Sequence, residues 1–305
     1  MFVFGFARAV IAPLSLLAGV FVWGTASAAK AGPQPTAIIA VGAQYDSTHV
    51  YVAPADLEAF VASFTATFDG RAGKPVVTTV TPTPSSTQFQ SIKTPVGALS
   101  TFAYTTPIPY PFGLERTGYL VTDMNQAIAA ARAAGASILV EPFKDPIGMD
   151  AIVEWPGGVK MQLYSHFVPP SYEPLASVPE NRVYLSPDRI DHFANAFIRF
   201  SRGKVLSDDW HADGAELGKP GQAYRRIRIE SKFGKMQIMA TDGHLPFPFG
   251  HDISGYEVGD LNETLAKARA HGATVLVEPV ELTDRRTAIV QFPGGFIAEI
   301  HSAGR

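Results

Sequence analysis

The sequence predicts an α+β fold made of four βαβββ modules, arranged as two tandem copies of a unit of roughly 130 residues. The first observation is an internal repeat. Residues 118–165 align without a gap with residues 255–302, and roughly twenty of about fifty positions are identical. The second is a shared order of strand and helix signals. The third is composition, because 46% hydrophobic and 17% charged residues are typical of a globular chain with a sizeable core.

The module at 118–165 has the clearest signals. Its expected elements are a strand at 119–121, a helix at 126–134 and strands at 137–140, 151–154 and 159–164. Asp123 or Asn125 is a suitable helix N-cap, and Gly135 suits the C-terminal end. A Pro-Gly-Gly turn at 156–158 precedes the last strand. The same elements are expected in the aligned segment of the second copy.

A weaker echo relates the segment that begins at His49 (HVYVAPADLEAF) to the segment that begins at Arg182 (RVYLSPDRIDHF). The first of these predicts a strand, a helix at 56–68 and strands at 76–80, 87–92 and 99–105. Each copy therefore holds two modules. The expected parts of the chain are an N-terminal extension at 29–47, a first copy at 48–167, a Pro-rich linker at 168–180 and a second copy at 181–305.

The first 28 residues have the layout of a secretory signal peptide. Arg8 precedes an apolar run from Val10 to Trp23, and Ala26-Ser27-Ala28 resembles a cleavage site. The alternative is an uncleaved membrane anchor, but the run is short for a span and contains Pro13. We expect a periplasmic or secreted protein without stable membrane association after cleavage.

Charge and cysteine content exclude several classes of function. The net charge of −3 and the lack of a basic stripe give no reason to expect a nucleic-acid partner. The absence of cysteine excludes disulfides, thiolate nucleophiles and Cys-ligated zinc.

The pattern H-V-Y-V-x-P-x-D-L from His49, the final hairpins of the type A-I-V-x-x-P-G-G and the βαβββ order resemble the vicinal oxygen chelate superfamily. This superfamily includes glyoxalases, fosfomycin- and bleomycin-resistance proteins and extradiol dioxygenases, and the resemblance covers the chain from His49 to its end. It implies two half-barrel cups, each formed by two modules around one site. It does not select a reaction, because the superfamily includes lyases, transferases, isomerases, dioxygenases and metal-free binding proteins.

The resemblance also implies three metal-ligand positions in each cup, at the openings of two first strands and on one last strand. Within each copy these positions hold His49, Arg116 and Gln162 in the first, and Arg182, Ile253 and Glu299 in the second. Neither set is a complete metal site.

Pairing the modules across the copies separates these residues by their chemistry. The first and fourth modules would join His49 and Glu299 with His251, which lies two residues before Ile253 and on the same strand face. Two imidazoles and a carboxylate suit a divalent ion such as Zn, Mn, Fe or Ni, with open positions for substrate oxygens. Glu299 or His251 would then move the catalytic proton.

The second and third modules would collect Arg116, Arg182 and Gln162, and the two positive charges would repel a cation. That cup would be either a degenerate site or one in which these residues bind an anionic part of a substrate. Phe249 is expected either on an apolar wall of the pocket or in ordinary packing. Glu115 and Asp252 occupy matching places and are expected as solvated loop residues or caps. An insertion around Trp210 is expected as a lid or a solvated loop.

The leading expectation is an exported, divalent-metal-dependent lyase, isomerase or dioxygenase that acts on a small molecule with vicinal oxygens. The alternative is a metal-free protein that binds or sequesters a small molecule, as the bleomycin-resistance proteins of the superfamily do, and that uses no cofactor. Dimers that exchange modules occur in this superfamily, so the resemblance is compatible with a homodimer.

Overall fold

The computed structural model describes residues 38–304, which belong to one compact unit. The expected signal peptide at 1–28 and most of the expected extension lie outside the described residues. Within the described part, no helix is both long and apolar enough to span a membrane.

The first sheet is built from β1 (Ser47–Tyr51), β2 (Arg71–Ala72), β3 (Val76–Thr78), β4 (Thr87–Thr94), β5 (Gly97–Tyr104), β6 (Thr117–Leu120), β7 (Ser137–Lys144), β8 (Gly148–Trp155) and β9 (Val159–His166). The strand order is β2-β4-β5-β1-β6-β9-β8-β7, with β3 paired to β4. All of these strands come from the first copy, which we call the N-terminal repeat.

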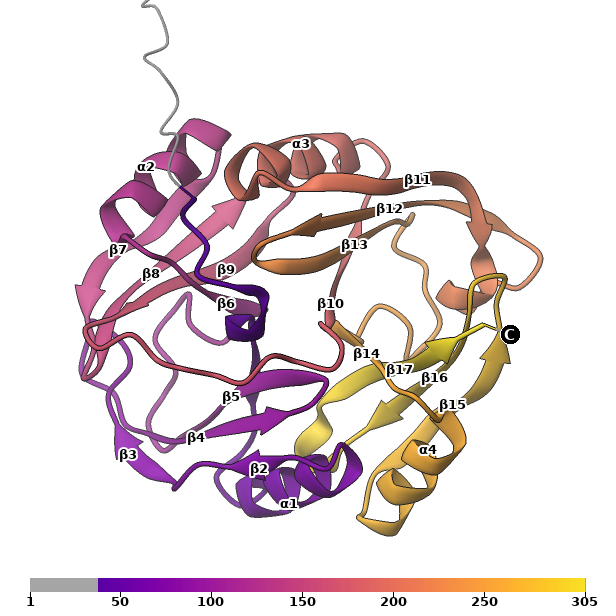
Figure 1. Cartoon of the computed structure of the whole chain (residues 1–305), viewed down its shortest axis with the longest axis horizontal. Coiled ribbons are helices and arrows are strands. Elements are labelled where there is room, and N and C mark those ends of the chain that lie inside the picture. The colour runs from indigo at the N-terminus through magenta and orange to yellow at the C-terminus, as the bar shows by residue number, and fades with distance from the viewer. Residues whose placement is uncertain (1–37, 305) are drawn as a thin grey trace, which may run out of the picture. The chain divides into compact units, whose positions relative to one another are not determined.

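The second sheet is built from β10 (Glu180–Leu185), β11 (Lys204–Asp213), β12 (Ala223–Ser231), β13 (Gly234–Ala240), β14 (Ser254–Glu257), β15 (Thr274–Glu281), β16 (Arg285–Gln291) and β17 (Ile297–Ala303). Its order, β11-β12-β13-β10-β14-β17-β16-β15, corresponds strand by strand to that of the first sheet. We call this half the C-terminal repeat. Both sheets are curled, and we call the concave face of each sheet its cup (Figure 1).

The described residues form four α-helices. They are α1 (Leu57–Thr67), α2 (Met124–Ala134), α3 (Ile190–Ser201) and α4 (Leu261–Ala270), and short 3₁₀ turns lie at Ala43–Tyr45, Gly214–Leu217 and Pro293–Gly295. The side chain of Asp123 accepts a hydrogen bond from the backbone N–H of Gln126, so α2 begins two residues before the expected position. Gly135 ends α2 in the left-handed region, at φ 97°, as glycine permits. Asp260 caps α4 in the same way through Glu263.

Each cup is formed within one repeat, so the prediction that the first and fourth modules share a cup is wrong. The first strands of the two modules of one repeat pair with each other: β1 pairs with β6, and β10 pairs with β14, both antiparallel. The backbone N–H of His49 donates to the carbonyl of Arg116 at 3.1 Å, and that of Arg182 donates to Ile253 at 3.0 Å. These hydrogen bonds join neighbouring modules into one continuous sheet.

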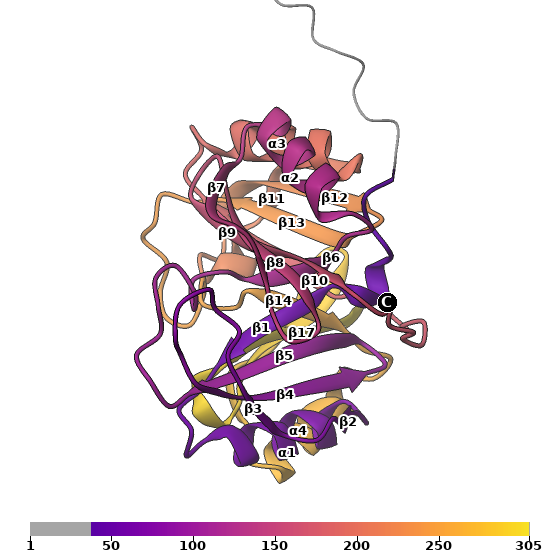
Figure 2. The same cartoon turned by 90° about the vertical axis from the view of Figure 1, so that its left-hand side faces the viewer.

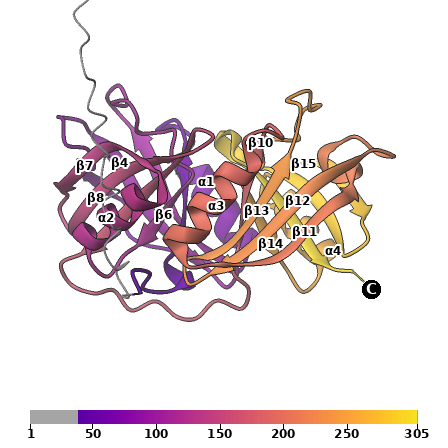
Figure 3. The ribbon, with the colours of Figure 1, turned by 90° about the horizontal axis from the view of Figure 1, so that it is seen from above.

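The helical layer does join modules across the repeats. Helix α1 lies beside α4, and α2 lies beside α3 (Figure 2). One core cluster includes Trp155 of the N-terminal repeat and Phe197 and Phe200 of the C-terminal repeat. A second includes Phe60 and Phe64 on α1 together with residues of α4, β16 and β17. Burying each such ring stabilises the fold by about 1.5–3 kcal/mol, so the two repeats, side by side in Figure 3, share their cores.

Candidate functional site

The structure does not bring together the predicted metal ligands His49, His251 and Glu299. His49 lies on β1 of the first sheet, whereas Glu299 lies on β17 of the second. His251 is exposed, and its ring lies beside that of Phe247. No group of three His, Cys, Asp or Glu side chains within residues 38–304 is arranged to hold a metal ion.

The N-terminal cup brings His49 and Gln162 together at Gly118. A Cβ atom on Gly118 would lie 2.8 Å from His49 Nε2 and 3.0 Å from Gln162 Oε1. Both side chains therefore approach the same point of β6, and glycine leaves the space that they occupy. The sequence prediction had placed Gln162 with two arginines instead.

Glu115 orients the His49 ring. Its Oε1 lies 3.3 Å from His49 Nδ1 and accepts a hydrogen bond from the Tyr51 hydroxyl, while its Oε2 accepts one from the backbone N–H of Leu114. This contact holds the Nδ1 side of the ring against Glu115, and His49 Nε2 lies on the cup side beside Gly118. Glu115 is only 4% exposed, so the expectation of a solvated loop residue or cap is wrong.

Tyr51 completes this group. Burial and the neighbouring Glu115 raise the pKa of the Tyr51 hydroxyl, so the hydroxyl keeps its proton and acts as a donor. Tyr51 also stacks on Phe102, with ring centroids 5.1 Å apart. The His49 side chain is thus held in place from behind by a buried network.

The N-terminal cup contains a cavity of about 480 Å³, within the usual range for small-molecule sites. The strands on one side of β1 supply most of the apolar lining, which comprises Val76, Val77, Val80, Phe89, Leu99 and Phe102. The strands on the other side supply polar groups, which comprise Asp150, Gln162, Tyr164 and His166. Ser47, Ser91 and Ser100 also face the cavity, and Ser47 Oγ lies 2.8 Å from Ser100 Oγ.

The C-terminal cup has Arg182 at the position of His49. The Arg182 side chain is buried, and its Nε lies 2.7 Å from Asp252 Oδ2. Its Nη1 lies 3.4 Å from Glu216 Oε1 and 3.8 Å from Glu299 Oε2. Asp252 corresponds to Glu115 and, like it, is a buried partner of the first strand, so the expectation of a solvated loop or cap is wrong here too.

Glu299 is satisfied by protein groups. It accepts hydrogen bonds from the Thr287 hydroxyl and, at 2.9 Å, from His301 Nδ1. Burial alone would raise the pKa of Glu299, but His301, Arg182 and Arg285 together lower it, so Glu299 is ionised. A bidentate pair joins Arg285 to Glu180 at 2.7 and 3.1 Å. These side chains occupy the centre of the cup.

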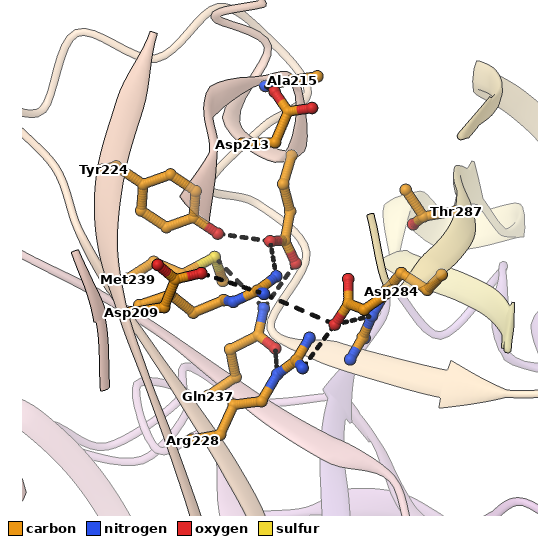
Figure 4. A network of polar contacts seen from close by, with 12 residues as sticks. Asp209, Asp213, Ala215, Tyr224, Arg228, Gln237, Met239, Asp284 and Thr287 are labelled. Carbon is orange, nitrogen blue, oxygen red and sulfur yellow. Dashed lines mark hydrogen bonds and ion pairs between the residues drawn. The ribbon is translucent and has the colours of Figure 1, made fainter. Parts of the chain in front are cut away.

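The insertion around Trp210 closes the C-terminal cup from one side. It forms the end of β11 and the 3₁₀ turn at Gly214–Leu217, which carries Glu216 into the cup. Glu216 accepts hydrogen bonds from the Tyr224 hydroxyl, from Arg226 Nη1 at 2.7 Å and from Gln237 Nε2 at 2.6 Å. Figure 4 shows Tyr224, Gln237 and Arg228 converging on this network, with Asp284 at its other side. The 3₁₀ turn is therefore a plug, whereas Trp210 on β11 is exposed to solvent.

The two sheets have the same register, so side chains at matching positions can be compared, and their lengths explain why one cup is open and the other is filled. His49 pairs with Ser100, which pairs with Ser91, and Arg182 pairs with Gln237, which pairs with Arg228. The same comparison places Gly148 opposite His166 and Arg285 opposite Ala303. At matching positions the C-terminal repeat has long side chains where the N-terminal repeat has short ones, namely Arg228 for Ser91, Gln237 for Ser100, Glu180 for Ser47 and Arg285 for Gly148.

The residues of the cups do not fit a metal centre of the type that the resemblance implies. In the N-terminal cup, His49 and Gln162 supply one imidazole and one neutral amide, and the β6 residue between them is Gly118. In the C-terminal cup the corresponding residues are Arg182, Glu299 and Gly255. Catalytic metal sites use about three protein ligands, so each cup is at least one donor short.

Arg116 and Phe249 lie away from the N-terminal cavity. Arg116 Nη1 donates to the backbone carbonyl of Arg182 at 3.0 Å, so Arg116 links the two repeats. Burial lowers the pKa of Arg116, and the nearby Tyr184 and Asp252 oppose this effect. Phe249 lies against Gly218, beside the plug. The predicted grouping of Arg116, Arg182 and Gln162 in one cup is therefore wrong.

A larger hollow of about 1070 Å³ lies outside both cups, along α1, α4 and the linker. Charged side chains along it form ion pairs, since Lys267 Nζ lies 2.8 Å from Asp69 and 3.2 Å from Glu263. No convergent group of unsatisfied polar atoms marks this surface, so the N-terminal cup is the better candidate site.

Comparison with known proteins supports the fold. No protein-family profile and no curated protein sequence matches the chain. Among solved structures, a mutant 4-hydroxymandelate synthase from Streptomyces coelicolor is similar, with a TM-score of 0.58 and 13% identity, over 86% of this chain and 93% of that one. A 2,2′,3-trihydroxybiphenyl 1,2-dioxygenase from Sphingomonas wittichii has a TM-score of 0.54 and 11% identity, over 88% and 92% of the two chains.

A fusion protein of a xylose isomerase-like TIM barrel and 4-hydroxyphenylpyruvate dioxygenase matches over 89% of this chain and 50% of its own, with a TM-score of 0.54 and 13% identity. The chain therefore has the vicinal oxygen chelate fold, as the sequence resemblance predicted. At these identities the likeness establishes the fold and leaves the reaction open.

Proposed function

We propose that the chain is a metal-independent binding protein that holds a small organic molecule in the N-terminal cup. The observation that carries the proposal is the contrast between matching cups. One contains a cavity of about 480 Å³ with apolar and polar walls, and the other is filled by its own charged side chains. Protein interiors are otherwise closely packed, and the short side chains of Ser91 and Ser100 leave room in this cup for a ligand.

A metal-dependent enzyme is the second candidate, because one observation favours it. A carboxylate beside Nδ1 of a histidine, as Glu115 is beside His49, is an arrangement found around metal-ligating histidines, and Gln162 Oε1 lies near the same point of β6 as His49 Nε2. The two candidates make opposite predictions for metal content. We expect protein that is purified without chelator and then supplied with Zn, Mn, Fe(II) or Ni to hold less than about 0.1 equivalent of metal per chain. Elemental mass spectrometry measures this metal content. About one equivalent of metal that is lost in His49→Ala would establish the enzyme candidate instead.

A cup-filling variant tests the binding proposal directly. Ser91→Arg combined with Ser100→Gln installs the residues that fill the C-terminal cup at matching positions. We expect the wild type to bind aromatic fragments in saturation-transfer NMR, and the double variant to lose that binding while its circular dichroism is unchanged. Gln126→Arg is the matched control, since it adds the same charge on the exposed face of α2. Equal binding by the double variant and the wild type would contradict the proposal.

Export belongs to the same proposal. An apolar run followed by Ala26-Ser27-Ala28 supports cleavage before Ala29 and a periplasmic or secreted mature chain. Intact mass of the protein recovered outside the cytoplasm checks this expectation. A soluble form that retains residues 1–28 would contradict it.

A further inference from the structure

Asp150 is a buried acidic side chain on the wall of the N-terminal cavity. It lies on β8 and is 5% exposed. Its neighbours Ala151 and Val153 pack in the core, so strand alternation turns Asp150 to the cup side, where it lines the cavity. A carboxylate in this position needs a partner, because burying an unpaired charge is costly.

No partner for this carboxylate is present among residues 38–304. The charges that reach it are those of Asp145 and Glu115, which have the same sign, and no hydrogen bond or cation opposes them. Burial and these like charges raise the pKa of Asp150 well above its usual range. The cavity's lysine, Lys93, has its Nζ 3.5 Å from the centre of the Tyr172 ring, which also lines the cavity, and it forms no ion pair with Asp150.

The matching position of the C-terminal cup is different. Register places Thr287 where the N-terminal repeat has Asp150, and the Thr287 hydroxyl donates to Glu299. In that cup, every carboxylate that we described faces a guanidinium group or an imidazole. The unpaired acid is therefore specific to the cup that has room for a ligand.

The remaining lining is suited to a cationic molecule with an apolar body. Phe89 and Phe102 lie with their ring centroids 5.4 Å apart, and Tyr164 pairs across the strands with Asp150. Aromatic faces attract ammonium groups, and the valines of β3 and the loop beyond it offer an apolar surface next to them.

We propose that the N-terminal cup binds an organic amine in its protonated form, with its ammonium group paired to Asp150 and its apolar body against Phe89, Phe102 and the β3 valines. This inference rests on the proposed function and adds the class of ligand to it. The alternative role for Asp150 is a neutral acid that donates a hydrogen bond to an uncharged ligand, and that role predicts the opposite order of affinities.

Three probes with one carbon skeleton separate these outcomes. They are 1-naphthylmethylamine, which is cationic at pH 7, 1-naphthalenemethanol, which is neutral, and 1-naphthoate, which is an anion. Naphthalene fluorescence and ligand-observed NMR both report binding. We expect the amine to bind at least about tenfold more tightly than the alcohol, and the anion to bind most weakly, because a hydrogen bond between charged groups is stronger than one between neutral groups.

Asp150→Asn removes the charge and keeps the shape of the side chain. We expect it to reduce the preference for amine over alcohol to about twofold or less, with little change in the affinity for the alcohol. Glu154→Gln is the matched control, since Glu154 lies on the same strand, pairs with Lys160 at 2.6 Å and does not line the cavity. It should keep the preference.

The outcomes distinguish the two proposals. If the alcohol binds as tightly as the amine, or if Asp150→Asn retains the preference, the cationic ligand class is wrong while a binding cup remains. If none of the three probes binds to the wild type, and the cup-filling variant matches it, the proposed function fails as well.

Discussion

Replacing Glu216 by glutamine should destabilise the chain strongly, because it removes the charge at the centre of the C-terminal cup. Glu216 is 3% exposed and accepts hydrogen bonds from Tyr224, Arg226 and Gln237. Glutamine has nearly the same volume, so it leaves no cavity. The change therefore removes a buried negative charge and replaces one acceptor oxygen by an amide N–H donor that faces other donors.

The expected magnitude follows from the ionisation of this group. Burial alone would raise the pKa of Glu216, but Arg182 and Arg226 lower it to about 2 from its usual 4.5. One pKa unit corresponds to about 1.4 kcal/mol, so the charge contributes on the order of 3 kcal/mol at pH 7. Breaking a buried ion pair on one side typically costs about 3–5 kcal/mol, which agrees in size.

Urea unfolding at several pH values measures this effect. The folded-state pKa is lowered, so the contribution is fully present above pH 4.5 and is lost as the pH falls toward 2. The loss caused by Glu216→Gln should therefore be about 3 kcal/mol at pH 7 and should shrink on acidification. Glu230→Gln, which removes an exposed partner of Lys204, should change stability by less than about 0.5 kcal/mol.

Two outcomes would refute this reasoning about the plug. A loss below about 1 kcal/mol at pH 7 would mean that the network contributes little net stability, as some buried ion pairs do. A loss that does not change with pH would mean that the carboxylate charge is not its cause. Glu216→Ala adds an independent check. Acetate at about 100 mM should bind in place of the lost carboxylate and partly restore the stability of this variant, whereas it should leave the stability of the wild type unchanged.

Three further predictions concern the fold. Burial raises the pKa of Asp46 to about 7, although the hydrogen bonds that Asp46 accepts from Thr117 and Asn181 oppose this effect. The contribution of Asp46 to stability is therefore present below pH 4 and is lost as the pH rises through about 7. Urea unfolding of Asp46→Asn between pH 5 and 8 should show a flatter profile than that of the wild type. Phe197→Ala, within the core shared by α2 and α3, should cost about 3–5 kcal/mol, whereas Phe167→Ala at an exposed position should cost less than about 1 kcal/mol. Residues 181–305 expressed alone should lack a cooperative unfolding transition, because α4 would lose its contact with α1, and a sharp transition would show that the repeat folds alone.

The sequence predicted the fold well because its signals are local or repeated. Asp123 and Gly135 mark the ends of α2 through hydrogen bonds to their own neighbours, and these signals do not depend on the rest of the chain. The predicted βαβββ order of elements along the chain is confirmed by the structure. The pairing of modules could not be predicted in the same way. The antiparallel contact between β1 and β6 joins residues about seventy positions apart, and no local sequence pattern indicates it.

The candidate site was predicted only in part for the same reason. His49 and Gln162 were identified from their places in the modules, and both line the N-terminal cavity. Sorting residues by charge then placed Glu299 with His49, because an imidazole and a carboxylate suit a metal. Asp150 was missed because a single acidic residue in a strand carries no spacing signal. Glu115 and Asp252 did carry a spacing signal, because they occupy matching positions in the two repeats. A contact of each residue with the first strand of its repeat was not inferred from this signal.

The shared cores explain how one cup can lose its cavity without loss of the fold. Each core cluster contains side chains from both repeats, so the helical layer holds the two sheets whatever their concave faces carry. Residues that fill a cup alternate along each strand with residues that fill the core, so they can change independently. In the C-terminal repeat this freedom produced a dense ion network around Arg182, closed by Glu216. In the N-terminal repeat the same positions hold serines and glycine, and the unpaired carboxylate of Asp150 remains there without a partner from the described chain.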